Sequence, residues 1–351
     1  MDPTLFLVVI AGGSGTRFWP KSTSRRPKQL LPFPKETLLT QTVKRFENLV
    51  PVHQRMIVTT QSLQNAIADE NLNAQILAEP QGRNTAPCIY WAAREISKTH
   101  PQGIMLVMPA DHYIASPENF CSVVKNASQW AKTNEDLITL GIHPTRPETG
   151  YGYLRTAEPL KQAGNCMSPK KVEAFVEKPN LEKAKQFLQS GNYLWNGGMF
   201  IWRAEVILKA FDRWMPEMKA TWEKAQGQVE LAYPQLTATS IDYGVMEKAD
   251  NVVTFPLDCG WDDLGNWTSL EGLAPSLGAQ QGGNVVTSGD LLSIDSEGNI
   301  IDAPEKLIAL LGVQNLIIVE HGKALLVAQK ERAQDIRKIV DQLKMTHPDL
   351  V

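Results

Sequence analysis

The feature that most constrains this chain is an apolar run near its start that opens directly into a glycine-rich loop. Residues 5–10 read LFLVVI, and they are followed at once by Ala11-Gly12-Gly13-Ser14-Gly15-Thr16-Arg17. An apolar run without polar alternation is typical of a strand that is buried on both faces of a parallel sheet. Glycines after such a strand let backbone N–H groups approach phosphate oxygens, because no Cβ stands in the way. The segment therefore predicts a buried strand that ends in a loop suited to phosphate.

Two familiar glycine loops do not match this segment. A dinucleotide-binding fingerprint needs a third small residue where Phe18 stands, and a Walker loop needs Gly-Lys-Ser/Thr after four intervening residues. Cations follow instead, at Arg17, Arg25, Arg26 and Lys28. Backbone donors combined with fixed cations suit the triphosphate of a nucleotide. Taken alone, the same residues also fit a glycine-rich turn followed by a solvated basic loop.

Strand-like and helix-like segments alternate through the first two-thirds of the chain. The predicted strands cover residues 5–11, 56–60, 74–78, 104–108 and 137–140. The predicted helices include residues 38–49 and 86–97, the second with Asn84 and Thr85 as candidate caps and Pro87 in its first turn. This alternation predicts a doubly wound α/β sheet, in which ligands bind beyond the carboxyl ends of the strands.

A segment rich in Gly, Pro, Ser and Gln, residues 274–284, precedes a tail with a different sequence pattern. We expect a domain boundary there, with a catalytic domain over residues 1–275 and a small domain over residues 284–351. Short alternating runs predict strands at residues 284–287, 291–293, 307–310, 316–319 and 324–327. A helical pattern over residues 331–343 ends the tail. We expect this β-rich module to serve packing or oligomerisation and to supply no catalytic group.

Composition and charge restrict the classes of partner. The chain has 351 residues and a formal net charge of −3, which gives no electrostatic reason to expect nucleic acid. No run of 18 apolar residues is present, so we expect neither a membrane span nor a membrane partner. The first apolar run lacks a basic flank and is interpreted as a strand and not as a signal peptide. The scattered cysteines predict free thiols and a cytoplasmic protein, at Cys88, Cys121, Cys166 and Cys259.

The glycine loop and the basic residues after it, AGGSGTRFWPKSTSRRPKQLLP, resemble the signature of the sugar-1-phosphate nucleotidyltransferases. In the form FWP…SRRPKQ the segment is similar to that of the mannose-1-phosphate guanylyltransferases. Further similar segments follow in the family's order, at 79–87 (EPQGRNTAP), 109–112 (PADH), 145–153 (TRPETGYGY), 175–179 (FVEKP), 195–200 (WNGGMF), 240–248 (SIDYGVMEK) and 261–267 (WDDLGNW). One departure is Gly197, where the family usually has serine, and it puts one sugar contact in doubt. The resemblance extends from Ala11 to Trp267.

The resemblance implies a Rossmann-like mixed sheet of the nucleotide-diphospho-sugar transferase type. It also implies a small C-terminal β-helix-like domain ending in a helix, as in the short family members, which dimerise. The implied reaction is GTP plus mannose 1-phosphate giving GDP-mannose and diphosphate, without the isomerase activity of the longer members. One alternative is another sugar or base, as in a glucose-1-phosphate thymidylyltransferase. A second is a non-catalytic regulator that binds nucleotide sugars, which we would expect to lack Arg17, Asp111 or Asp263.

The resemblance also assigns site residues. The catalytic residues are expected to be Arg17, Lys28, Asp111 and Lys178. The nucleotide-binding residues are expected to be Ala11, Gly12, Gly13, Gly15, Thr16, Arg17, Lys28, Glu79, Asn84, Thr85, Ala110 and Asp111. The sugar phosphate is expected to meet Gly152, Glu177, Lys178, Asn196 and Asp242. Mg²⁺ or another divalent cation is expected at Asp111 and Asp263, with the adjacent Asp262 as a competing ligand.

The chemistry agrees with these residue types. The nucleophile is a phosphate oxygen that is already anionic, so no general base is required, and positioning and electrostatics should carry catalysis. Guanine has two adjacent donors, N1–H and the N2 amino group, and a carboxylate accepts both, which suits Glu79. Two alternatives remain for this position. Glu79 could cap the helix that begins near Thr85, or backbone groups near Ala11 and Gly12 could recognise the base.

Overall fold

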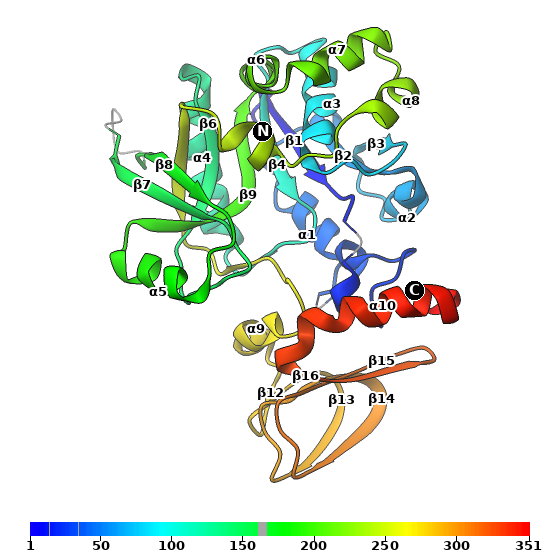
Figure 1. Cartoon of the computed structure of the whole chain (residues 1–351). Helices are drawn as coiled ribbons and strands as arrows, with labels where there is room; N and C mark the ends of the chain where they lie inside the picture. Colours follow the sequence, from blue (N-terminus) through cyan, green and yellow to red (C-terminus); the bar gives the residue numbers. More distant parts are fainter. Residues whose placement is uncertain (14, 34, 161–166) are drawn as a thin grey trace. The chain divides into compact units, whose positions relative to one another are not determined.

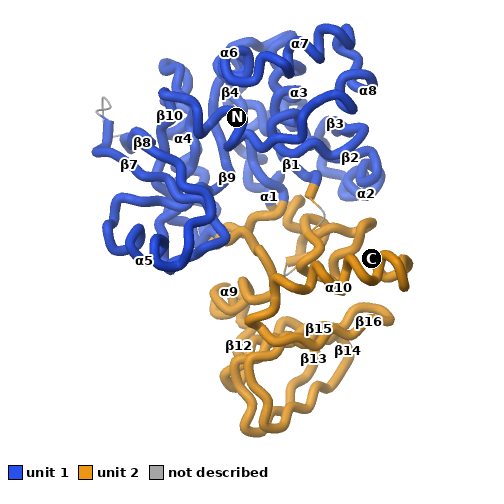
Figure 2. Tube along the Cα trace, viewed as in Figure 1, with its two compact units in different colours: residues 1–12, 42–110, 116–261 blue, residues 13–41, 111–115, 262–351 orange. Residues whose placement is uncertain are grey.

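The computed structural model describes residues 1–13, 15–33, 35–160 and 167–351 (Figure 1). The thiol predicted for Cys166 lies outside the described residues, whereas Cys88, Cys121 and Cys259 are free cysteines as predicted. The chain divides into two compact units, drawn in different colours in Figure 2. Unit 1 comprises residues 1–12, 42–110 and 116–261, and unit 2 comprises residues 13–41, 111–115 and 262–351.

Unit 1 contains a mixed sheet of nine strands in the described part of the chain, in the order β3-β2-β1-β4-β9-β6-β10-β8-β7. β1 pairs in parallel with β2 and β4, and β9 runs antiparallel between β4 and β6. The strands are β1 (Leu5–Ile10), β2 (Arg55–Thr60), β3 (Gln75–Glu79), β4 (Ile104–Pro109), β6 (Leu137–Ile142), β7 (Tyr153–Pro159), β8 (Lys170–Val176), β9 (Tyr193–Arg203) and β10 (Val252–Leu257). The Rossmann-like mixed sheet implied by the resemblance is confirmed.

Helices cover both faces of this sheet (Figure 1). Phe6 and Val8 of β1 belong to the core that includes α3, and successive strand residues point to opposite faces, so Leu7 and Val9 face the other layer. The helices of unit 1 are α2 (Gln64–Ala68), α3 (Thr85–Ser97), α4 (Pro117–Thr133), α5 (Leu181–Ser190), α6 (Ala204–Trp214), α7 (Pro216–Lys224) and α8 (Val229–Ala232). The turn η6 (Asp242–Met246) is π-helical. No helix among the described residues is long and apolar enough to cross a membrane.

Hydrogen bonds near two helix ends help to determine where those helices begin and end. The side chain of Asn84 caps α3 as predicted, since its Oδ1 atom accepts a hydrogen bond from the Thr85 amide at 2.8 Å. Helix α1 (Leu38–Lys44), which passes from unit 2 into unit 1, was predicted to continue to Leu49 but ends at Lys44. The chain after it tightens into turns, and the buried Arg55 guanidinium donates to the carbonyl oxygens of Glu47 and Val50.

Unit 2 contains a sheet of five strands in the described residues, in the order β12-β13-β14-β15-β16. The strands are β12 (Gln280–Gln281), β13 (Asn284–Ile294), β14 (Ile300–Leu311), β15 (Leu316–His321) and β16 (Ala324–Gln329). Unit 2 also contains β5 (Tyr113–Ile114), α9 (Ser269–Leu277), the short helix η7 (Lys330–Asp335) and α10 (Ile336–Thr346), while β11 (Trp261–Asp262) links the units. Strands β13, β14 and β15 pair in parallel, and the chain ends in helices, which confirms the β-helix-like tail.

Two predicted strands of the tail form one strand in the structure. Residues 284–287 and 291–293 both belong to β13, whose pairing with β14 shifts register at Ser288. Gly289 has φ +92°, and a Cβ there would clash with the Ala303 carbonyl oxygen. The polar residues that resemble a turn in the sequence are therefore accommodated as an irregularity within a long strand.

The compact units group the segment after the glycine loop, residues 13–41, with the tail. Phe18 lies 4.9 Å from Trp267 between ring centroids, and the Trp267 indole donates to the Trp19 carbonyl oxygen at 3.2 Å. These aromatic residues share one core with Leu270, Ile317 and Ile336. The first residues of the segment 274–284 end α9, and Ala274 is fully buried. Burial of the aromatic residues after the glycine loop therefore joins that loop to the tail.

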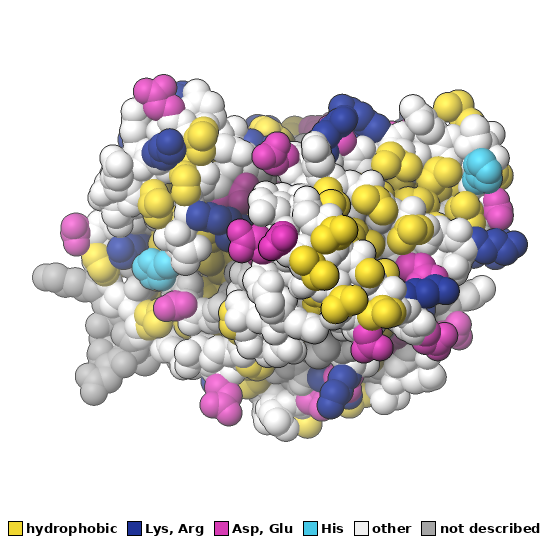
Figure 3. All heavy atoms as spheres, turned by 90° about the horizontal axis from the view of Figure 1, so that it is seen from below, with side chains coloured by type: hydrophobic (Ala, Val, Ile, Leu, Met, Phe, Trp, Pro, Cys, Tyr) yellow, Lys and Arg dark blue, Asp and Glu magenta, His cyan; other side chains and the backbone are white. Residues whose placement is uncertain are grey.

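One face of unit 2 exposes large apolar side chains on neighbouring strands. Ile294 of β13 and Leu311 of β14 are direct partners in the sheet, and their exposed fractions are 54% and 73%. Leu292 of β13 and Leu307 of β14 are also exposed. Figure 3 shows hydrophobic side chains gathered on the face seen from below. Exposed apolar patches of this kind are typical of contact surfaces.

Candidate functional site

Side chains of unit 2 hold the backbone of the glycine loop at Gly13 and Gly15. Ser22 donates to the Gly15 carbonyl oxygen at 2.7 Å, and the Gln29 amide donates to the Gly13 carbonyl oxygen at 3.0 Å. Gly15 has φ +57°, and a Cβ there would clash with Cβ of Lys28, so only glycine fits. Gly13 is exposed, and a Cβ on it would meet nothing within 4 Å. The carbonyl groups of Gly13 and Gly15 are thus held by hydrogen bonds, and open space lies beside Gly13.

Arg17 stands in a single helical turn, η1 (Thr16–Phe18), directly after this loop. Its neighbour Phe18 is buried, whereas Arg17 itself is exposed. The guanidinium donates from Nη1 to Oε1 of Gln334 at 3.0 Å. Gln334 belongs to η7, in the tail that we expected to serve packing or oligomerisation.

Lys28 contacts both segments that carry the predicted metal ligands. Its ammonium lies 2.8 Å from Asp111 Oδ2 and donates to the carbonyl oxygens of Asp263 at 2.5 Å and Leu264 at 3.0 Å. Lys28 is 6% exposed, so these oxygens replace water around the charge. Burial raises the pKa of Asp111, but the nearby Lys28 and His112 outweigh that effect, and the net shift is downward. Asp111 is therefore held as a carboxylate.

The two adjacent aspartates differ in what their carboxylates do. Asp262 is 7% exposed, and its Oδ1 atom accepts from the Leu264 amide at 2.7 Å, which closes a local turn. Asp263 is half-buried, and its carboxylate lies beside Gly265, where a Cβ would approach Oδ1 to 3.2 Å. The described residues contain no group of three or more His, Cys, Asp or Glu able to hold a metal. Two hard carboxylates fit a divalent cation whose other ligands are phosphate oxygens and water.

In unit 1, Gly12 and Glu79 lie beside each other at the carboxyl ends of β1 and β3. Glu79 is 4% exposed and accepts a hydrogen bond from the Tyr233 hydroxyl at 2.7 Å. A Cβ on Gly12 would lie 3.5 Å from the other carboxyl oxygen, Oε2. Burial raises the pKa of Glu79 to about 7, against a smaller opposing effect of the Tyr233 hydrogen bond. Glu79 does not cap α3, because Asn84 does.

The other residues of unit 1 assigned to the nucleotide follow strand ends or begin α3. Ala11 donates its amide to Val58, and Ala110 donates its amide to Ile10, both to carbonyl oxygens. Thr85 uses its hydroxyl to accept from the Ile241 amide at 2.8 Å. The backbone at these positions is therefore fixed by neighbouring segments.

The residues predicted to bind the sugar phosphate form one cluster. Asn196 donates from its amide nitrogen to Asp242 Oδ1 at 2.8 Å, and Lys178 donates to Glu177. A Cβ on Gly152 would lie 2.8 Å from Glu177 Oε2, so glycine makes room for that carboxylate. Burial raises the pKa of Asp242, and the Glu177 charge adds to this, against the Asn196 hydrogen bond. The hydrogen bond to Glu177 raises the pKa of Lys178.

Position 197, where the family usually has serine, points away from this cluster. A Cβ on Gly197 would lie 2.9 Å from the Leu140 carbonyl oxygen and 2.9 Å from Met199 Cε. A larger residue would therefore press on β6 and Met199. The missing hydroxyl leaves the arrangement of Asn196 and Asp242 unaffected.

The structure adds residues that the motifs did not single out. Tyr233 holds Glu79, Ser22 holds Gly15, and Gln334 holds Arg17. Ser22 and the motif residue Gln29 lie in the basic segment, where a search for loop-supporting polar residues could have selected them. Tyr233 and Gln334 lie in segments with no local signal for these contacts.

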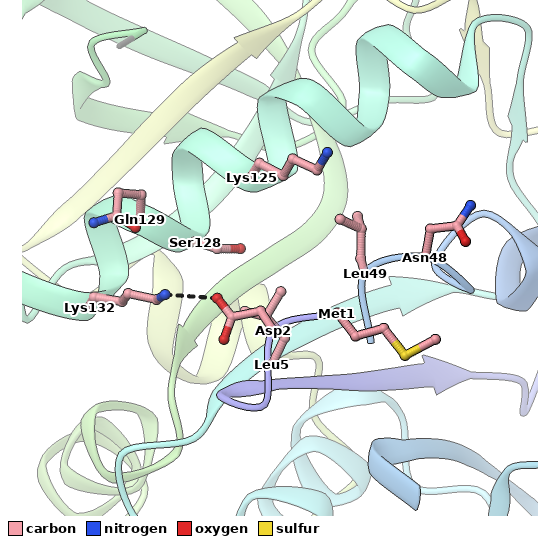
Figure 4. A pocket seen from close by; sticks show the side chains of 9 residues that line it. All are labelled: Met1, Asp2, Leu5, Asn48, Leu49, Lys125, Ser128, Gln129 and Lys132. Carbon is pink, nitrogen blue, oxygen red and sulfur yellow. Dashed lines mark hydrogen bonds and ion pairs between the residues drawn. The ribbon is translucent and has the colours of Figure 1, made fainter. Parts of the chain in front are cut away.

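A cavity of about 360 Å³ in unit 1 lies at the opposite end of β1 from the glycine loop (Figure 4). Lys132 and Asp2 point toward one another across it and form an ion pair at 2.7 Å. Its lining residues are Met1, Asp2, Leu5, Asn48, Leu49, Lys125, Ser128, Gln129 and Lys132. None of them belongs to the predicted site, so the cavity is separate from the motif residues.

Comparison with known proteins gives matches over almost the whole chain. Residues 7–279 match a family model described as Nucleotidyl transferase, and residues 289–343 match one described as MannoseP isomerase/GMP-like beta-helix domain. The chain is 37% identical to a protein of Escherichia coli named mannose-1-phosphate guanylyltransferase, over 97% of this chain and 74% of that protein. It is 36% identical to the xanthan biosynthesis protein XanB of Xanthomonas campestris, over 96% of this chain and 73% of that protein.

A solved structure is similar over the full length. It is described as mannose-1-phosphate geranyltransferase from Thermus thermophilus, and it superimposes with a TM-score of 0.86 at 33% identity. The match covers 97% of this chain and 99% of that one. The likeness therefore includes the β-rich tail as well as the sheet of unit 1.

Proposed function

The chain belongs to the nucleotidyl transferase family, among the mannose-1-phosphate guanylyltransferases, and we propose that it transfers GMP from GTP to α-D-mannose 1-phosphate. The products are GDP-mannose and diphosphate. The observation that most supports this proposal is the cluster of Gly152, Glu177, Lys178, Asn196 and Asp242. These residues come from separate segments of the sequence, yet they meet with donors and acceptors suited to sugar hydroxyls and a phosphate.

The reaction is an in-line displacement at the α-phosphorus of GTP. An anionic oxygen of mannose 1-phosphate forms the new bond to phosphorus, and the bond to the oxygen that bridges the α- and β-phosphorus breaks. The electron pair leaves with diphosphate, so negative charge grows on the leaving group. We assign to Arg17 the role of stabilising that charge. Losing such a contact typically lowers the rate by about 10²–10³.

Asp111 and Asp263 would hold a divalent cation, Mg²⁺ or another, together with the nucleotide phosphates. The pair fits because both are hard oxygen ligands and Lys28 holds Asp111 ionised beside the Asp263 backbone. When bound, the cation supplies charge neutralisation for the phosphate oxygens. Lys28 positions the two aspartate-bearing segments and adds its own positive charge for the nucleotide phosphates.

The other nucleotide contacts are proposed from the loop and strand ends. The backbone of Ala11, Gly12, Gly13, Gly15 and Thr16 would serve the phosphates, and Asn84, Thr85 and Ala110 would line the nucleoside. Glu79 would accept the N1–H and N2 amino donors of guanine, held in place by Tyr233. This assignment separates guanine from thymine, which has one ring donor between two carbonyl acceptors.

On the sugar side, Glu177 and Asn196 would bind hydroxyl groups and Gly152 would donate its backbone amide. Lys178, whose side chain is 63% exposed, would hold the sugar phosphate and steer its oxygen toward phosphorus. Asp242 would orient Asn196, because it accepts the Asn196 amide hydrogen.

We also propose a homodimer formed through the apolar face of unit 2, and a cytoplasmic location suited to free thiols.

The test is diphosphate release from a panel of nucleoside triphosphates and sugar 1-phosphates, with and without Mg²⁺. The pair GTP and mannose 1-phosphate should exceed every other pair in kcat/KM, and chelation of the metal should stop turnover. A preference for dTTP with glucose 1-phosphate would replace the proposal by the thymidylyltransferase alternative. Binding of GDP-mannose without turnover of any pair would favour the regulator.

A further inference from the structure

The segment that follows the glycine loop is bound by the tail at several places. Arg17 donates to Gln334, the Trp19 indole donates to the Leu350 carbonyl oxygen at 2.9 Å, and Lys21 forms an ion pair with Asp302 at 2.6 Å. Asp302 is 5% exposed. These contacts recur along the segment, so its conformation depends on the tail as well as on local sequence.

Gln334 is placed firmly enough to orient a flexible partner. The preceding residue, Ala333, is 3% exposed and belongs to the core of unit 2 together with Ile336. At the start of η7, Lys330 forms an ion pair with Glu271 of α9 at 2.6 Å. Anchors on both sides of Gln334 therefore fix its backbone against the unit.

The Gln334 amide can orient the Arg17 guanidinium without neutralising its charge. A guanidinium group carries five N–H donors, and the Gln334 amide oxygen accepts one of them while it remains uncharged. A carboxylate at the same place would pair with the guanidinium and compete with phosphate. The neutral acceptor leaves the charge of Arg17 and its other donors available for a polyanion.

We propose that Gln334 is a positioning residue for phosphoryl transfer, through which the C-terminal module holds Arg17 ready for the triphosphate. The inference rests on the proposed function, because it takes Arg17 to be the group that meets the leaving diphosphate. It changes the expectation that the tail serves packing or oligomerisation alone. A long arginine side chain loses rotamer freedom when it binds, and a preset orientation removes part of that cost.

Three substitutions separate the hydrogen bond from packing and charge. Gln334→Ala and Gln334→Met, which is close in shape but offers no amide acceptor, should both lower kcat/KM for GTP about threefold to tenfold, the effect of one typical net hydrogen bond. Gln334→Glu should lower it further, by tenfold or more, and added salt should reverse part of this loss because the pair is exposed. The KM for mannose 1-phosphate should stay within about twofold.

Gln342→Ala is the matched control, because Gln342 is an exposed glutamine in the same C-terminal region, on α10. It should leave the kinetics unchanged. Each variant should also keep the thermal unfolding midpoint of the parent, since Gln334 is itself exposed.

The deciding experiment repeats Gln334→Ala in an Arg17→Ala background. Arg17→Ala alone tests the proposed function, since it should cost about 10²–10³ in rate. If Gln334 acts through Arg17, its substitution should have no further effect in that background. An equal loss in both backgrounds, or no loss in the parent enzyme, would overturn the positioning role. A fully active Arg17→Ala enzyme would instead overturn the assignment of Arg17.

Discussion

The Lys28 ammonium lies 2.8 Å from Asp111 Oδ2, and the same ammonium donates to the backbone carbonyl of Asp263. A lysine with 6% exposure must replace its water shell with oxygen atoms, and here one carboxylate and two carbonyl groups do so. The lysine of the PKQ motif is thus a buried link between two segments that are distant in sequence. Each segment carries one of the carboxylates assigned to a metal ion.

Asp111→Asn should lower turnover by about 10²–10³, because the amide keeps the shape of the side chain but not the charge that a divalent cation needs. The fold should persist, since Lys28 keeps its two carbonyl partners. The measurements are turnover at saturating substrates, the thermal unfolding midpoint and Mn²⁺ affinity. Normal turnover by the variant, or full activity of the parent in excess EDTA, would refute the metal role.

The neighbouring aspartates should respond differently to the same change. Asp262 uses Oδ1 as an acceptor for the Leu264 amide, and an asparagine oxygen can replace it, so Asp262→Asn should cost less than about threefold in activity. Asp263→Asn removes a proposed ligand and should cost about as much as Asp111→Asn. The comparison requires kcat over a range of Mg²⁺ concentrations. Equal damage from the two substitutions would show that Asp262 also contributes to the metal site.

Much of the fold could be predicted because its signals are local. The apolar run of β1 needs no partner to be recognised, and the Asn84 cap lies next to the helix that it begins. The grouping of the residues assigned to the sugar phosphate could also be predicted, since the resemblance brings their motifs together. The structure then places Asn196 against Asp242 and Gly152 against Glu177.

The contacts that could not be predicted join positions far apart in sequence. Tyr233 and Glu79 are 154 positions apart, and Arg17 and Gln334 are 317 apart. Neither partner lies in a pattern that indicates the other. The grouping of the glycine loop with the tail likewise depends on which core buries Phe18 and Trp19, which is a property of three-dimensional packing.

Charge placed on the apolar face of unit 2 should separate a dimer. Leu307 and Leu311 of β14 are 66% and 73% exposed, so Leu307→Glu with Leu311→Glu should leave the folded monomer intact. In a dimer the same carboxylates would be buried without partners, which is strongly unfavourable. Sedimentation at micromolar concentration should show a dimer for the parent and a monomer for the variant. Met345→Glu, at an 80% exposed site on α10, is the control.

Point substitutions are preferable to removal of the tail, because the tail shares its core with Phe18 and Trp19. A truncated chain would expose that core and would not report on assembly alone. A parent protein that sediments as a monomer, or a doubly substituted variant that remains dimeric, would exclude this face as the interface.

Glu79 should make stability depend on pH. Its pKa rises from 4.5 in the unfolded chain to about 7 in the folded state, so the folded state prefers the protonated form. The contribution of Glu79 to the free energy of unfolding is therefore complete below pH 4.5. This contribution, about 3 kcal/mol, is lost as pH rises through 7. Glu79→Gln keeps an acceptor for Tyr233 and removes this loss. The thermal midpoint of the variant should exceed that of the parent at pH 8 and match it near pH 4.5, and a constant difference would contradict this.

Glu79 should also decide which base the enzyme accepts. A carboxylate can accept N1–H and the N2 amino group of guanine together, whereas inosine lacks the amino group and thymine has one ring donor. An unpaired polar group costs about 1–3 kcal/mol, which is roughly tenfold to a hundredfold in selectivity. The parent enzyme should therefore prefer GTP to ITP and dTTP by such factors in kcat/KM, and Glu79→Gln should prefer it less.

Because the pKa of Glu79 is about 7, the base selectivity of the parent enzyme should also depend on pH. A protonated carboxyl group loses an acceptor that guanine needs, so the GTP/ITP ratio of the parent should fall between pH 8 and pH 6. The ratio of Glu79→Gln should not change over the same range, because its side chain does not titrate. Tyr233→Phe is the matched variant, since it keeps the carboxylate but releases it from its hydrogen bond. Unchanged GTP/ITP and GTP/dTTP ratios in Glu79→Gln would remove Glu79 from base recognition and leave it to the backbone at Ala11 and Gly12.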